Sequence, residues 1–258
     1  IHEMHSHARV VWRVAFRHGA RGYAVQHASV SPGKRWYFCH PEERASGLRL
    51  PDAMYVFNQG TTELLRPCYD GTKFLLGCSH RFSHWKGLTA SRDGKGGHYL
   101  FVGALASFDN DVLIESLRRL VEGPARPTGV RLRLRLHPQA EVGTGDRGWI
   151  RSRLEDGSIE SSHGIPLQDD IAGALAVVGM GTTVLEEALL LGCPVVQLTH
   201  PDYLSNIALS GLRGAVTVDC RDLSAGHLAE ASRRGVDRGA LRESLGLDQP
   251  TVTYARLF

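Results

Sequence analysis

The stretch AVVGMGTTVLEEALLLGCPVVQ, residues 176–197, decides the fold that we predict for this 258-residue chain. Its apolar pattern predicts a buried strand over 175–179, a helix over 182–191 and a second strand over 194–198. Glycine lets a ligand approach the backbone closely, and the start of a helix presents unpaired N–H groups to an anion. In an open α/β sheet the ligand lies beyond the carboxyl ends of the strands, where residues 179–183 must lie. This loop is therefore predicted to hold a phosphate.

The same loop also has an ordinary structural interpretation, in which a threonine caps the helix. It lacks the GK[ST] sequence of a Walker A loop and is not a GxGxxG loop. In the phosphate-binding interpretation, Gly179, Gly181, Thr182 and Thr183 contact the ligand. Glu187 lies early in the helix, where it either interacts favourably with the helix dipole or accepts a hydrogen bond from a ribose hydroxyl.

Strands alternate with helices on both sides of this stretch, which predicts an α/β protein with parallel sheets covered on both faces. A glycine-rich, charged segment separates two such runs and indicates two Rossmann-type domains facing a cleft. We place the N-terminal domain at 1–85, the linker at 86–98, the C-terminal domain at 99–234 and a helical tail at 235–258. The other predicted elements are helices at 2–18, 61–66, 110–122, 224–234 and 238–246, and strands at 22–27, 53–57, 73–78, 99–105, 130–136 and 215–219.

Composition places the chain among ordinary globular proteins, with 42% apolar and 22% charged residues. A formal net charge of +3 is too small to indicate nucleic-acid binding. The five cysteines are scattered and form no CxxC pair, which argues against a disulfide framework or a zinc site and favours a reducing cytoplasm. Because the chain starts at Ile1, within a helical pattern, we expect the N-terminal domain to be short or partial.

A second candidate segment is the predicted strand 130–136, in which arginine alternates with leucine, so that the arginines share one face. His137 and Pro138 close this strand, and proline fixes the turn. A histidine at a strand end can donate a hydrogen bond to a phosphate, although a surface arginine stripe with a turn histidine gives the same pattern. Because residues 179–183 belong to the same sheet, we expect Arg135, His137 and Pro138 to help bind a nucleotide.

The N-terminal run offers candidates for catalysis. His27 ends the first predicted strand, and Glu3 lies on the first predicted helix, one turn from His7. A carboxylate near a cleft can act as a base or a nucleophile, whereas a solvated helix surface is the alternative for Glu3. The histidines of this helix lack the HExxH arrangement, so no metal site is predicted.

Two motifs resemble a known family. RLHP at 135–138 and GMGTTVLEEALLLGCPVV at 179–196 resemble the C-terminal half of GT-B glycosyltransferases that use CMP-activated sugars. In bacterial sialyltransferases and β-Kdo transferases of that group, an HP motif and a later Ser/Thr pair hold the CMP. Here His137-Pro138 and Thr182-Thr183 fall in those places, and the pair departs from the pattern in being Thr-Thr.

A second resemblance spans residue 3 to about residue 220. The run from Glu3 through Trp12 and the segments at 17–30, 50–58 and 205–218 are similar to the bacterial surface carbohydrate biosynthesis protein group, which resembles the same β-Kdo transferases. Each motif is short, and their order and spacing carry the resemblance.

The resemblance implies a GT-B fold and a metal-independent glycosyltransferase without a cofactor. It would move Kdo or another ulosonic acid from a CMP-activated donor to a cell-surface glycan or glycolipid, in the cytoplasm or peripherally at the inner membrane. Glu3 and His27 would be catalytic, and Arg81 would pair with the carboxylate of the sugar. The sequence has no DxD motif at the position where a metal-dependent GT-A glycosyltransferase would need one. A nucleotide-sugar epimerase, a CDP-polyol phosphotransferase and a non-catalytic nucleotide-binding module remain the alternatives.

Overall fold

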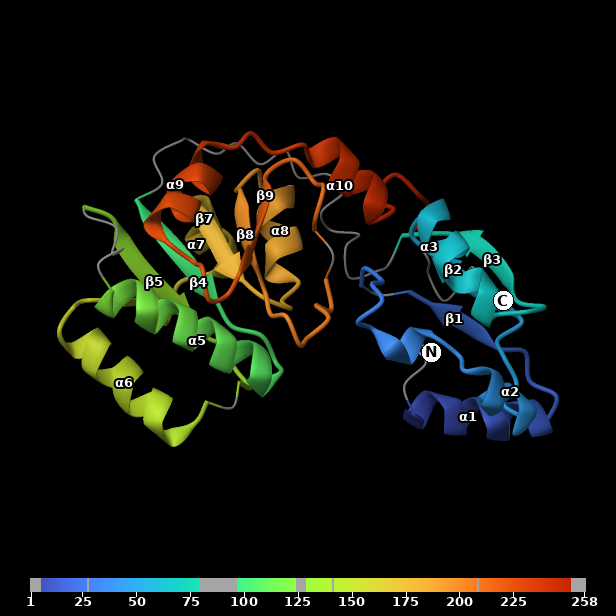
Figure 1. Cartoon of the computed structure of the whole chain (residues 1–258). Coiled ribbons are helices and arrows are strands. Elements are labelled where there is room, and N and C mark those ends of the chain that lie inside the picture. The colour runs from blue at the N-terminus through green and yellow to red at the C-terminus, as the bar shows by residue number, and fades with distance from the viewer. Residues whose placement is uncertain are drawn as a thin grey trace. The chain divides into compact units, whose positions relative to one another are not determined.

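The computed structural model describes residues 6–26, 28–78, 97–123, 129–140, 142–207 and 209–251. The chain forms two compact units, one comprising Ile1–Leu88 with Gly239–Phe258 and the other comprising Thr89–Arg238. Each unit contains its own parallel sheet, which confirms the predicted α/β architecture with two Rossmann-type units (Figure 1). Within the described residues, no helix is both long enough and apolar enough to cross a membrane.

The first unit is built on three parallel strands in the order β1-β2-β3. Its apolar core joins the buried Trp12 of the first helix to Met54 and Val56 of the middle strand. The strands are β1 (Tyr23–Val25), β2 (Ala53–Val56) and β3 (Lys73–Leu76), and the helices are α1 (Ser6–Arg17), α2 (Pro41–Ala45), α3 (Gln59–Leu65) and the short 3-10 turns Arg35–Tyr37 and Arg66–Cys68.

Residues 239–251, within the span predicted as a helical tail (235–258), belong to this first unit. Helix α10 (Arg238–Ser244) begins at the unit boundary, and its Ser244 carbonyl accepts a hydrogen bond from the Asn58 side chain. Farther along, the backbone N–H of Cys78 donates to the Pro250 carbonyl at 2.9 Å. Gly246 has a φ of +62° and lies so close to Phe57 that a Cβ there would be 2.5 Å from the Phe57 carbonyl oxygen. The segment is thus packed against the end of β2.

The second unit is a six-stranded, fully parallel sheet in the order β6-β5-β4-β7-β8-β9. Its strands are β4 (His98–Val102), β5 (Arg131–Arg135), β6 (Glu160–Ser161), β7 (Ala174–Gly179), β8 (Val195–Thr199) and β9 (Ala215–Asp219). Its helices are α5 (Ser107–Glu122), α6 (Thr144–Glu155), α7 (Leu167–Ala172), α8 (Val184–Leu190) and α9 (Ala225–Arg233). Helix α6 and strand β6 were not predicted from the sequence.

The order of these strands creates a switch point. From β4 the chain adds β5 and β6 on one side, and it then returns with β7 to the other side of β4. The connections after β4 and after β7 therefore leave the sheet in opposite directions. In open α/β sheets the crevice between two such carboxyl ends is where ligands bind. The predicted phosphate loop, residues 179–183, follows β7 directly and flanks this point.

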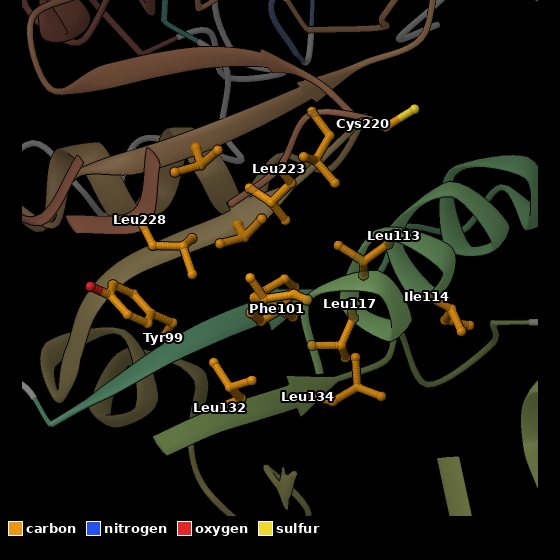
Figure 2. Packing of buried hydrophobic residues seen from close by; sticks show 14 of the residues in the cluster. Tyr99, Phe101, Leu113, Ile114, Leu117, Leu132, Leu134, Cys220, Leu223 and Leu228 are labelled. Carbon is orange, nitrogen blue, oxygen red and sulfur yellow. The ribbon is translucent and has the colours of Figure 1, made fainter. Parts of the chain in front are cut away.

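The core of the second unit explains why the predicted pattern succeeds. Strand β5 reads RLRLR, and Leu132 and Leu134 are buried while the arginines between them are more exposed, as the alternation predicts. Helix α5 turns Leu113 and Leu117 toward the sheet. Figure 2 shows these leucines gathered around Phe101 of the central strand β4. The buried cluster fixes β4, and hence the switch point, in the middle of the sheet.

Candidate functional site

The loop 179–183 makes a close approach to β4 and α5. A Cβ added at Gly179 would lie 3.2 Å from the Val102 carbonyl oxygen, and one added at Gly181 would lie 2.2 Å from Asp109 Oδ2. A side chain at residue 179 would therefore crowd the end of β4, and one at residue 181 would force the Asp109 side chain to move. Gly181 and Thr183 are partly exposed, whereas Gly179, Met180 and Thr182 are buried.

The two threonines of the loop differ in their surroundings. Thr182 is buried, and its Oγ1 accepts a long hydrogen bond of 3.4 Å from the Val184 N–H. Thr183 occupies the N-cap position of α8, but its side chain makes no capping hydrogen bond. Thr183 therefore does not cap α8 with its side chain, as the ordinary interpretation of this loop would require.

The start of α5 is clamped to the end of β4 by Asn110, which is fully buried. Its Oδ1 accepts from the Ala104 N–H at 2.8 Å, and its Nδ2 donates to the Ala104 carbonyl at 3.0 Å. These two bonds fix the connection 103–106 and with it the neighbouring residue, Asp109. The clamp places Asp109 between the loops that follow β4 and β7.

Asp109 is a residue of this site that sequence reasoning missed. Its side chain is 2% exposed, and the Gly181 N–H donates to its carboxylate. Burial raises the pKa of Asp109 to about 6, and the hydrogen bond from Gly181 opposes that rise only in part. Its other oxygen, Oδ1, has no hydrogen-bond partner within the described residues. The one available signal was an acidic residue at the start of the helix that follows the first strand of the sheet.

An aromatic group borders the same site. Phe108 is 39% exposed and packs edge-on against His200, with ring centroids 5.3 Å apart, and at a tilt against Tyr203, with centroids 4.9 Å apart. His200 and Tyr203 come from the connection that follows β8. The pKa of Tyr203 is raised, first by burial and then by the negative charge of Asp109. Three connections at the carboxyl edge thus converge around Asp109.

A cavity of about 560 Å³ opens beside the His-Pro turn. Its apolar walls include Leu136, Ile150 and Leu154, and His137 with Pro138 forms part of its lining. His137 is exposed, and its Nδ1 accepts from the Gln139 N–H at 3.2 Å, which holds the ring in the turn. The cavity lies at the ends of β5 and β6, on the same edge of the sheet as the switch point.

The arginine stripe of β5 is engaged in ion pairs. Arg133 donates to Asp170 at 2.8 Å and to Glu160 at 2.8 Å, and Arg135 donates to the Ile165 carbonyl at 2.8 Å and to Asp170 at 3.3 Å. Arg135 also lines the cavity beside His137. These contacts fit the alternative of a structural stripe better than a nucleotide-binding role for Arg135.

The remaining candidates are placed as follows. Glu3, His27 and Arg81 lie outside the described residues. Glu187 lies in α8 and is partly buried, and its neighbour Glu186 is 1% exposed. Within the described residues, no group of three His, Cys, Asp or Glu side chains is arranged to hold a metal ion.

No protein-family model and no curated protein matches this chain. Solved structures share its fold. A Listeria monocytogenes protein described as a UDP-N-acetylglucosamine 2-epimerase aligns at 14% identity with a TM-score of 0.57, covering 95% of this chain and 71% of that one. The S. aureus MnaA–UDP structure aligns at 12% identity with a TM-score of 0.55, covering 97% and 68%.

A chain of the GtfA/B complex aligns at 13% identity with a TM-score of 0.52, covering 96% of this chain. This chain spans 53% of that one and 45% of the TarM chain, about half the length of each. At such low identity the likeness establishes the fold alone: the chain has a GT-B-like α/β fold with a short N-terminal unit.

Proposed function

We propose that this protein is a glycosyltransferase of GT-B type and that residues 89–238 bind its nucleotide-sugar donor at the switch point. The observation that carries the proposal is the strand order β6-β5-β4-β7-β8-β9, with the loop 179–183 at the point where the order reverses. A ligand phosphate placed there meets backbone N–H groups and the hydroxyls of Thr182 and Thr183.

The nucleoside is placed in the cavity beside His137. From β7 to β5 is two strand spacings, or about 10 Å across the sheet edge. A nucleotide laid along this edge would pass over the end of β4, with its base between the apolar walls of the cavity and its phosphate at residues 179–183. A His137 donor at the mouth of the cavity would hydrogen-bond the nucleotide, as the motif resemblance implies. Pro138 keeps that histidine in the turn.

The donor that we propose is a pyrimidine nucleotide sugar. The motif resemblance favours CMP and a ulosonic acid such as Kdo, while the S. aureus MnaA structure is a complex with UDP. Glu3 and His27 stay our candidates for catalysis and Arg81 for the sugar carboxylate. The proposed acceptor is a cell-surface glycan or glycolipid.

Calorimetry with CMP, UDP and GDP tests this proposal directly. We expect one pyrimidine nucleotide to bind, and binding of none of the three would overturn the proposal. The variant His137→Ala should lose nucleotide affinity at least tenfold with an unchanged circular dichroism spectrum. His18→Ala, at an exposed position of the first unit, is the matched control and should bind like the wild type.

A nucleotide-sugar epimerase is the second candidate, favoured by the alignment with the Listeria monocytogenes protein over 95% of this chain. An epimerase converts its nucleotide sugar without any acceptor, whereas a transferase leaves it intact or slowly hydrolyses it. Product analysis by NMR after incubation of the protein with the bound nucleotide sugar alone separates the two activities.

A further inference from the structure

The backbone N–H of Gly181 is already occupied by a negative group of the protein itself. The carboxylate of Asp109 accepts this N–H, and its Oδ2 is so close that a Cβ at residue 181 would lie 2.2 Å away. The loop that should receive a phosphate therefore holds a carboxylate at one of its donors. A bound phosphate and an ionised Asp109 would compete for the same hydrogen bond.

Among the described residues, no positively charged side chain acts on Asp109. Burial and the Gly181 hydrogen bond are the influences on its pKa within the described residues, and no lysine, arginine or histidine contributes. From the connection after β8 it faces Tyr203, a phenol whose own pKa is raised, and His200 of the same connection packs edge-on against Phe108. An anion arriving at residues 179–183 would meet a second negative charge with no counter-ion between them.

We propose that Asp109 couples nucleotide binding at residues 179–183 to the uptake of one proton. The proton comes from solvent and adds to a carboxylate oxygen of Asp109, which becomes a neutral acid. The Gly181 N–H is released to a phosphate oxygen of the ligand, and the new Asp109 O–H becomes a donor to the same phosphate group. No other bond forms or breaks. This inference rests on the proposed nucleotide site.

Two features make this step accessible. The pKa of Asp109 is raised to about 6, so protonation near neutral pH requires only a modest shift. If Asp109 served to stabilise the start of α5 through the helix dipole, its ionised form would be favoured and its pKa would be lowered. Its pKa is instead raised. Asp109 Oδ1 is buried and has no hydrogen-bond partner among the described residues. A proton on this oxygen would let it donate a hydrogen bond to the phosphate.

The test is calorimetry of the whole chain between pH 6 and pH 8.5. The probes are UDP-N-acetylglucosamine and CMP-N-acetylneuraminate, whose phosphates do not titrate in this range. For the probe that binds, we expect the affinity of the wild type to fall about tenfold per pH unit above pH 6. Titrations in buffers of different ionisation enthalpy should show uptake of close to one proton at pH 8.

The variant Asp109→Asn keeps the shape of the side chain and removes its charge. We expect its affinity to be independent of pH, at least tenfold tighter than the wild type at pH 8, and without proton uptake. Asp111→Asn, at an exposed position of the same helix, should retain the pH dependence of the wild type.

Binding by the wild type with no pH dependence and no proton uptake would overturn this inference and leave the proposed nucleotide site standing. Binding of neither probe, nor of CMP, UDP or GDP, at any pH by either protein would overturn the nucleotide site and this inference together. The proton count of the wild type decides the question even where the Asp109→Asn variant does not fold.

Discussion

Arg133 and Asp170 form a buried ion pair that joins β5 to α7, with Nη1 of the arginine 2.8 Å from Oδ1 of the aspartate. The Asp170 side chain is fully buried and also faces the buried His98 at 3.4 Å. Burial alone would raise the pKa of Asp170, but hydrogen bonds from His98 and Arg133 hold it well below its usual range. Arg133 lies on β5, the strand that leads to the His-Pro turn.

Replacing Asp170 with alanine should destabilise the second unit by about 3–5 kcal/mol, because the partly buried Arg133 loses a principal counter-ion. Urea denaturation followed by circular dichroism measures this loss. The exposed pair Arg153–Asp156 supplies the control, since Asp156→Ala should cost less than about 1 kcal/mol. Equal effects of the two substitutions would contradict a structural role for the buried pair. Because the folded pKa of Asp170 is lowered, its contribution is complete above about pH 4 and is lost only in stronger acid.

Asp109 should have the opposite effect on stability. Its folded pKa of about 6 lies above the value of a free aspartate, so ionisation disfavours the folded state as the pH rises from about 4 to 6. We expect Asp109→Asn to be more stable than the wild type by up to about 3 kcal/mol at pH 8, a difference that disappears below about pH 4. Urea denaturation at several pH values measures it. A variant less stable than the wild type at pH 8 would contradict the raised pKa.

Gly181→Ala should destabilise the protein by about 1–3 kcal/mol, because the new methyl group collides with the Asp109 carboxylate. The double variant with Asp109→Ala should recover much of this loss, which a double-mutant cycle measures as coupling. Gly148→Ala is the control, since Gly148 lies in α6 with open space around it and alanine favours a helix. Additive effects of the two substitutions at 181 and 109 would show that the close approach is absent.

Gly246→Ala should destabilise the first unit by more than the strain of a left-handed backbone alone, which costs about 1–2 kcal/mol. Its Cβ would also press on the Phe57 carbonyl, 2.5 Å away. Gly71→Ala separates the two effects, because Gly71 has a φ of +78° with nothing within 4 Å. Denaturation of both variants gives the difference. Equal losses of unfolding free energy in the two variants would show that the packing of Gly246 against Phe57 does not contribute to stability.

The sequence predicted those parts of the fold that depend on local patterns. The alternation in β5 and the strand–helix–strand unit around residues 176–197 follow from side-chain periodicity, and the structure confirms both. Helix α6 was missed because Ile150 is its only residue classed as buried, which leaves a weak apolar pattern. Strand β6 was missed because it has only two residues.

The candidate site was less predictable, because it depends on contacts between distant residues. Asp170 follows Arg133 by 37 positions, so no local pattern indicated that it would pair with the arginines of β5. Asp109 resembled an ordinary acidic residue at a helix start. Only the sheet order places it against Gly181, 72 positions away in the chain, and makes it a candidate of interest.

The packing of residues 239–251 against the end of β2 has a consequence for biosynthesis. The ribosome completes the six-stranded unit before it makes the residues that Asn58 and Cys78 bind. The first unit is therefore made before the six-stranded unit but acquires its last partners after it. Until then the ends of β2 and β3 lack their contacts with residues 239–251, and this unit is where we expect chaperones to engage the nascent chain.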